Sequence, residues 1–298
     1  MAENRRLARK GRWAMNKDRT FERIESLFDI ALFADVQVFV AGCGSGGAGA
    51  ALQLAMSGIR NFTLMDRDDL GPENVIRHVC GRSFIGKRKV DAVAEVLRDR
   101  NPNVSIATID ADIMSYPDLA SRIAESDVVV LATDNEPSRY VVNEICVKSN
   151  IPFVVARVFT RGIGGEVFAY RPPGGACLAC LEAFLQRTRF REGIREIELV
   201  SEEEREKVYG MEIPEIKDSP GLVVDISFIT SFHVRFVLEA IGRQLKERPK
   251  YLGLMDENYI VWGNRPVHPF RKHFELQRIE LSAQERCAVC SVRSPANV

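Results

Sequence analysis

The sequence of 298 residues lacks the features of a membrane-bound, secreted or nucleic-acid-binding protein. No apolar run reaches the roughly 18 residues that a membrane span needs, and the N-terminus has no apolar segment of the signal-peptide type. The 41 basic residues balance the 41 acidic ones, so no net field attracts nucleic acid. We interpret the locally basic residues 1–20 as a flexible or docking arm. We therefore expect a soluble, cytoplasmic protein with no membrane partner and no nucleic-acid partner.

Cysteine is absent from residues 181–286, and two C-x-x-C pairs flank this stretch. The pairs are Cys177 with Cys180 and Cys287 with Cys290. In a reducing compartment such pairs favour a metal over a disulfide. Four thiolates form a closed tetrahedral site for Zn²⁺, so we predict a structural zinc that ties the two pairs together. A redox role is disfavoured, because there are two pairs and neither has a thioredoxin-like context.

Short β-branched runs alternate with helical patterns between residues 35 and 155. This repetition predicts a parallel sheet with right-handed crossovers, that is, a doubly wound, Rossmann-like α/β fold. The expected strands are 36–42, 62–66, 104–110, 127–133 and 152–158. After residue 160 we expect a further strand, a charged and exposed crossover at about 187–218, and a mostly buried helix at about 221–246. A β-rich continuation and the last cysteine pair follow.

The segment VFVAGCGSGGAGAALQLA, residues 38–55, passes from an apolar run through a glycine cluster into a helical pattern. Gly42, Gly44 and Gly47 fit G-x-G-x-x-G after a strand and at the start of a helix, where backbone amides hold phosphate. Asp66 ends the next expected strand, where a carboxylate accepts hydrogen bonds from ribose hydroxyls. On these residues alone, an NAD-dependent enzyme fits as well as an ATP-dependent one.

Polar residues beyond Asp66 favour a triphosphate over a nicotinamide. Asn74, Arg77 and Lys89 supply one amide and two cations, and Asp134 follows the fourth expected strand. The carboxyl ends of parallel strands meet at one edge of the sheet, where ligands bind. Cations at that edge neutralise charge on phosphates, and an aspartate holds a metal ion. The sequence therefore predicts a nucleoside triphosphate with Mg²⁺.

Together these motifs resemble the MoeB/ThiF/HesA family, which is related to the adenylation domains of ubiquitin-activating enzymes. The resemblance covers roughly residues 20–292. It rests on GCGSGG, on D-x-D-x-x-x-x-x-N-x-x-R from Asp66 to Arg77, on G-x-x-K-V from Gly86 to Val90, on Thr133-Asp134-Asn135, and on the two cysteine pairs.

The resemblance implies a role for each matching residue. Glycines 42, 44 and 47 would approach the ATP phosphates, and Asp66 would hold the ribose. The triphosphate and its transition-state charge would be bound by Asn74, Arg77 and Lys89, and Mg²⁺ by Asp134 with Asn135 beside it. An N-terminal arginine of the family reaches into the neighbouring subunit's site. Arg23 is the candidate here, which implies a homodimer.

This chain departs from the family pattern at three positions. Ser45 stands where glycine is common, while His78 and Ile24 stand where glutamine follows the two arginines. Ubiquitin-activating enzymes and some smaller relatives also carry a reactive cysteine after the first zinc pair, in the stretch where this chain has none. We interpret Cys43 and Cys146 as buried hydrophobes, and Cys80 is weakly placed as a nucleophile. The sequence thus favours adenylation without a covalent enzyme intermediate in that stretch.

The resemblance implies ATP-dependent adenylation of the C-terminal carboxylate of a small ubiquitin-like or sulfur-carrier protein that ends in Gly-Gly. The product would be an acyl-adenylate, and the acceptor after it stays open: sulfur, a cysteine or an amine. The arm (1–20), the nucleotide-binding region (21–160) and the C-terminal part (161–298) would form one adenylation unit. The crossover would cover the partner's tail.

Several alternatives share the nucleotide residues. A relative that adenylates a peptide-antibiotic precursor or a carbamoyl group on a modified tRNA base would keep all of them, although the balanced charge disfavours the tRNA substrate. A non-catalytic partner of this fold would not need Arg77, Lys89 and Asp134 intact. An NAD-dependent oxidoreductase would bind a dinucleotide and not ATP.

Overall fold

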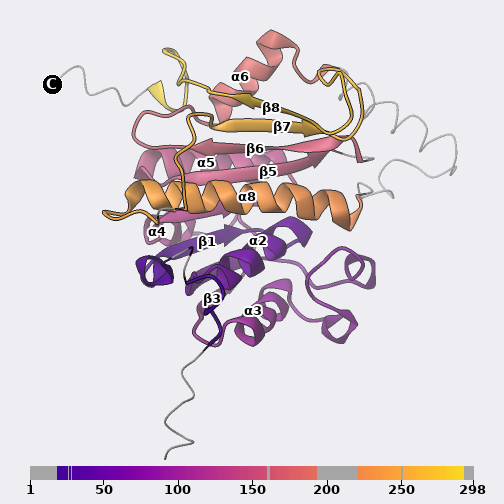
Figure 1. Ribbon diagram of the computed structural model, residues 1–298, viewed down its shortest axis with the longest axis vertical. Helices are drawn as coiled ribbons and strands as arrows, with labels where there is room; N and C mark the ends of the chain where they lie inside the picture. The colour runs from indigo at the N-terminus through magenta and orange to yellow at the C-terminus, as the bar shows by residue number, and fades with distance from the viewer. Residues whose placement is uncertain are drawn as a thin grey trace, which may run out of the picture.

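A computed structural model describes residues 19–25, 27, 29–159, 162–192, 221–249 and 251–291. Its centre is an eight-stranded sheet with the order β3-β2-β1-β4-β5-β6-β7-β8 (Figure 1). The strands are β1 (Gln37–Ala41), β2 (Asn61–Asp66), β3 (Ser105–Asp110), β4 (Val128–Leu131), β5 (Phe153–Phe159), β6 (Gly164–Tyr170), β7 (Tyr259–Gly263) and β8 (Glu275–Ile279). One continuous sheet therefore joins the strands before residue 160 to those after it.

The first five strands are parallel and the last three are antiparallel. This confirms the predicted doubly wound, mostly parallel sheet with a β-rich continuation. One boundary was wrong: the fourth strand ends at Leu131, and residues 132–135 form the loop that leads to the next helix. Because β1 lies between β2 and β4, the order in which successive strands are added reverses beside β1, and ligands bind at such a switch point.

Helices cover both faces of the sheet (Figure 1). One face packs against α2 (Ser45–Met56), α3 (Lys89–Arg100) and α8 (Val223–Gln244); the other packs against α4 (Leu119–Ala124), α5 (Glu136–Ser149) and α6 (Leu178–Thr188). Short 3₁₀ helices lie at Ile30–Phe33, Pro72–Asn74 and Arg82–Phe84. The sequence did not predict α4 or α6. Each face holds its own apolar core, with the sheet between them.

Helix α8 is less buried than predicted at its N-terminal end. It packs on α2 and on strands β4, β5 and β6, and Ile226 and Ile229 are buried. Leu222, Val224 and Phe228, on another face of the same turns, are exposed. These turns therefore carry more apolar side chains than the buried face of one helix can hold.

Parts of two expectations fall outside the described residues: the arm over 1–18 and the crossover over 193–220. The beginning of the predicted exposed crossover is partly buried, because Arg191 folds back onto the buried carboxylate of Glu166. Among the residues described, no helix combines the length and apolar character required to cross a membrane.

Candidate functional site

The glycine loop connects β1 to α2 by a turn that only small residues fit. Gly42 has φ +95°, in the left-handed region that favours glycine. A Cβ on Gly47 would overlap the carbonyl oxygen of Gly42 and lie 3.0 Å from Cβ of Ala132. Gly44 is the N-cap of α2 and has open space around it. The loop is therefore tightly packed at Gly47 and has open space at Gly44. Gly44 lies at the N-terminus of α2, a position that favours anions.

Asp66 anchors this loop from the end of β2. Its carboxylate accepts hydrogen bonds from the backbone amides of Cys43 (2.6 Å) and Asp68 (2.9 Å). Burial raises the pKa of Asp66, although these bonds and the charge of Lys89 oppose the rise. Each carboxylate oxygen accepts one backbone bond and retains a second lone pair, which a ribose hydroxyl can use.

Two cavities meet beside the loop. The smaller, about 450 Å³, is lined by Asp66, by 111–114 after β3 and by 132–135 after β4. The larger, about 770 Å³, is lined by Asn74, Arg77 and Lys89 and continues along α8. The residues that line both cavities are Gly44, Asp68, Lys89, Ala132 and Asp134. The structure thus brings Gly42, Gly44, Asp66, Asn74, Arg77, Lys89, Asp134 and Asn135 to one connected space, whereas Gly47 lies beneath it.

The cationic and amide groups are held by local contacts. Lys89, the first residue of α3, donates to the carboxylate of Asp68 at 2.7 Å. Burial alone would lower the pKa of Lys89, but Asp68 and Asp66 raise it above its ordinary value, so the amine stays charged. Asn74 accepts a hydrogen bond from the amide of Gly71 through Oδ1, which leaves its amide group as a donor.

The loop after β4 adds oxygen ligands. Asp134 is exposed and lines both cavities. Asn135 caps α5 by accepting from the amide of Ser138 and donates to Asp134 at 3.3 Å. Thr133 Oγ1 is buried beside the smaller cavity and has no hydrogen-bond partner among the residues that the structure describes. A hard divalent cation prefers such oxygens, so this loop fits Mg²⁺, with Asp134 as the carboxylate ligand.

His78 ties the glycine loop to the segment that carries Asn74 and Arg77. Its Nδ1 accepts from the amide of Cys80 at 3.1 Å, so Nε2 carries the proton and donates to the carbonyl of Cys43 at 2.8 Å. Burial lowers the pKa of His78, which keeps the ring neutral in this role. The sequence had marked His78 only as a departure from the family pattern.

An ionic cluster around Glu166 lines the larger cavity. Glu166 on β6 is 2% exposed and accepts from Arg157 (2.7 Å), Arg191 (Nε, 3.1 Å) and the hydroxyl of Tyr259 (2.6 Å). Arg157 also pairs with Glu182 at 2.7 Å. The sequence assigned no role to these residues, because they come from four separate elements and only the tertiary fold joins them.

The three isolated cysteines are buried. Burial raises the pKa of Cys80 to about 12 and raises the pKa values of Cys43 and Cys146 well above the ordinary range. Since the thiolate is the nucleophile, these side chains are inert packing groups in this conformation.

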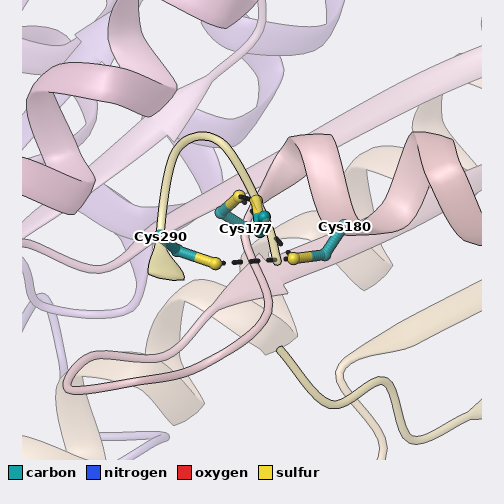
Figure 2. A group of neighbouring side chains, drawn as sticks. Cys177, Cys180 and Cys290 are labelled. Carbon is teal, nitrogen blue, oxygen red and sulfur yellow. Dashed lines mark hydrogen bonds between the residues drawn. The ribbon is translucent and has the colours of Figure 1, made fainter. Parts of the chain in front are cut away.

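The four remaining cysteines converge at the start of α6 (Figure 2). Sγ of Cys177 lies 3.9 Å from that of Cys180 and 3.5 Å from that of Cys287, and Cys180 lies 3.5 Å from Cys290. A tetrahedron with Zn–S bonds of about 2.3 Å has edges of about 3.8 Å, so the cluster fits Zn²⁺.

The surroundings of this four-cysteine cluster support the same chemistry. Hydrogen bonds from Cys177 and from the amide of Gln284 lower the pKa of Cys180, and this favours the thiolate form that binds a metal. None of the four cysteines lines either cavity, so the cluster fits a structural role and not a catalytic one.

Arg23 is the one predicted site residue that the structure leaves apart. It lies exposed in a turn over residues 20–25 and lines neither cavity of this chain. Its role in a neighbouring subunit stays a prediction.

Comparison with known proteins places this geometry in a family. The ThiF family model matches residues 26–243. The chain is 32% identical over 174 residues to the sulfur carrier protein ThiS adenylyltransferase of Escherichia coli (strain K12), covering 55% of this chain and 68% of that protein. It is 31% identical over 146 residues to adenylyltransferase and sulfurtransferase MOCS3-1 of Zea mays, covering 48% of this chain. The match spans only 30% of that longer maize protein.

Among solved structures, a crystal structure of E. coli MccB with AMPCPP and MccA has a TM-score of 0.68 at 19% identity. It covers 93% of this chain and 75% of MccB, and at this identity the likeness shows the fold alone. The family model matches well over half of the chain, and the ThiS adenylyltransferase is matched over two thirds of its own length. The chain therefore belongs to the ThiF family.

Proposed function

We propose that this protein adenylates the C-terminal carboxylate of a small ubiquitin-like or sulfur-carrier protein, using ATP. The observation that carries the proposal is the pair of joined cavities. One has the Asp66 carboxylate and the size for a nucleoside, and the other has the space for a second substrate. They share Gly44, Lys89 and Asp134, where the triphosphate would lie.

Different residues of this chain bind the substrates and stabilise the transition state. Asp66 binds the ribose, and the loop amides at the N-terminus of α2 bind phosphate oxygens. The substrate carboxylate attacks the α-phosphorus; the bond to the bridging oxygen breaks, and acyl-adenylate and pyrophosphate form. No general base is needed, because a carboxylate is already ionised near neutral pH. Arg77, Lys89 and Asn74 stabilise the charge on the departing pyrophosphate. Asp134 would hold Mg²⁺, which would supply further charge neutralisation.

The relatives support this substrate class. One is named for adenylation of the sulfur carrier ThiS, another is a molybdopterin-synthase adenylyltransferase of E. coli, 31% identical over 148 residues, and a third is a SAMP-activating enzyme of Haloferax volcanii. We also propose that the four-cysteine cluster binds structural Zn²⁺, that the protein is cytoplasmic, and that it forms a homodimer in which Arg23 completes the partner's site.

The test is ATP–pyrophosphate exchange with a panel of small proteins that end in Gly-Gly. We expect exchange with at least one carrier, and Asp134→Ala should reduce it on the order of 10²-fold, as for loss of other transition-state contacts. Asp118→Ala is the matched control, because Asp118 is exposed and lines neither cavity. Unchanged exchange in Asp134→Ala would remove the Mg²⁺ assignment, and no exchange with any carrier would overturn the proposed function.

A further inference from the structure

The larger cavity continues past the phosphate region along one face of α8. Thr230 and His233, one helical turn apart, line it together with Ile226 and Ile229 from the same helix and Val158 from β5. The wall is thus apolar with two polar side chains set into it. Under the proposed function, nucleoside and phosphates would occupy the smaller cavity and the region of the shared residues, which would leave this part for the second substrate.

His233 presents one uncommitted nitrogen within this wall. The side chain is 1% exposed, and Nε2 lies 2.8 Å from the carbonyl oxygen of Val154. A carbonyl only accepts, so Nε2 carries the proton and Nδ1 is an acceptor. Nδ1 has no hydrogen-bond partner among the residues that the structure describes. Burial lowers the pKa of His233 to about 4, so the ring is neutral at physiological pH.

Thr230 adds a hydroxyl to the same face. It is 3% exposed and packs with its methyl group against Gly49 of α2, the helix that follows the glycine loop. Its hydroxyl, too, has no hydrogen-bond partner within the described part of the chain. Two nearly buried polar groups without partners on a cavity wall indicate a ligand that supplies the missing bonds.

The charged groups of the ionic cluster do not compete for that ligand. Glu166 is paired with Arg157 and Arg191, and Glu136 with Arg139. No carboxylate in this ionic cluster is left to bind an ammonium group, so a cationic side chain would be buried here without a counter-ion. A neutral peptide segment meets no such cost.

We propose that Thr230 and His233 bind the backbone of the substrate's C-terminal tail, and that the surrounding wall disfavours a lysine or arginine among the last residues before the carboxylate. Nδ1 of His233 accepts from a peptide N–H, and the Thr230 hydroxyl bonds to an adjacent peptide group. The terminal carboxylate then points toward Gly44 and Lys89, where the α-phosphate would lie. The inference rests on the proposed function and names positioning residues, not catalytic ones.

The test distinguishes the roles of the two ring nitrogens of His233. His233→Gln keeps a donor in reach of the Val154 carbonyl but has no atom in place of Nδ1, while Thr230→Val removes only the hydroxyl. We expect each variant to raise the KM for the carrier roughly five- to tenfold in pyrophosphate exchange, as for one lost hydrogen bond. The kcat, the KM for ATP and the melting temperature should stay unchanged. Ser231→Ala is the control, because Ser231 is exposed and its hydroxyl bonds to the carbonyl of Ser227.

A second measurement uses a carrier whose last peptide bond, or the one before it, is replaced by an ester, which removes one N–H donor. At one of these positions, the ester should raise the KM of the wild-type enzyme and leave that of His233→Gln unchanged. Wild-type exchange with an unaltered KM in His233→Gln overturns this inference alone. No wild-type exchange with any carrier overturns the proposed function and this inference with it.

Discussion

Glu166→Gln tests whether the ionic cluster that lines the larger cavity stabilises the fold. Glu166 accepts hydrogen bonds from Arg157, Arg191 and Tyr259, and these side chains come from β5, the residues after α6, and β7. The substitution keeps the shape of the side chain and removes its charge. It therefore isolates the electrostatic part of the contact.

The expected loss of unfolding free energy depends on the ion pairs that remain after the substitution. Breaking a buried ion pair costs about 3–5 kcal/mol, because an uncompensated charge is left in the interior. Arg157 would still have Glu136 at 3.2 Å and Glu182 at 2.7 Å. We therefore expect the low end of that range, about 3 kcal/mol of unfolding free energy at neutral pH.

The effect should depend on pH in one direction. Burial alone would raise the pKa of Glu166, but Arg157 and Arg191, with Tyr259, lower it below its ordinary value. A carboxyl with a lowered folded-state pKa contributes stability above its unfolded pKa of about 4.3, and the contribution is lost as the pH falls through the folded-state pKa. The difference between wild type and Glu166→Gln should thus shrink below about pH 4.

Urea denaturation followed by circular dichroism, at pH 7 and at several lower pH values, measures the loss of unfolding free energy and its dependence on pH. Tyr259→Phe removes one hydrogen bond to the carboxylate and should cost about 1.5 kcal/mol. Glu95→Gln is the control, because the Lys87–Glu95 pair is half exposed and should not change stability measurably. A loss under 1 kcal/mol for Glu166→Gln at pH 7, or a loss that does not vary with pH, would refute the reasoning.

Two further predictions concern the metal cluster and the glycine loop. Purified protein should contain one Zn²⁺ per chain by elemental analysis; a strong chelator or Cys180→Ser should remove it and lower the melting temperature, while Cys80→Ala keeps it. Zinc retained in Cys180→Ser would contradict the assignment. Gly47→Ala should destabilise the protein and abolish ATP binding, because the new methyl group meets the Gly42 carbonyl, whereas Gly44→Ala should fold normally. Calorimetry and thermal denaturation measure both variants, and normal ATP binding by Gly47→Ala would contradict the packing described for the loop.

The sequence predicted the parallel strands and the edge at which polar residues gather, because local patterns determine both. The β-branched run of β1 and the spacing of Gly42, Gly44 and Gly47 are visible without a structure. Helix α6 was not predicted, because the cysteine pair at its N-terminal end was interpreted only as a pair of metal ligands. Helix α4 has only six residues, too few for a clear periodic pattern.

The wall of the larger cavity could not be predicted for a different reason. His233 stands alone in an apolar helix and is most simply interpreted as a core residue. Glu166 lies in an apolar strand with no sequence neighbour to pair with; its arginines come from residues 157 and 191. The role of such a side chain depends on partners that only the tertiary fold brings close to it.

The four-cysteine cluster also bears on the order of events during synthesis. Its two pairs are separated by 110 residues in the chain, and α8, β7 and β8 all lie between them. At roughly 5–20 residues per second, the second pair leaves the ribosome about 5–20 s after the first. A zinc ion held by all four sulfurs would therefore bind fully only after the antiparallel edge of the sheet has been translated. Complete metal binding would then report that the C-terminal strands of the sheet have been translated.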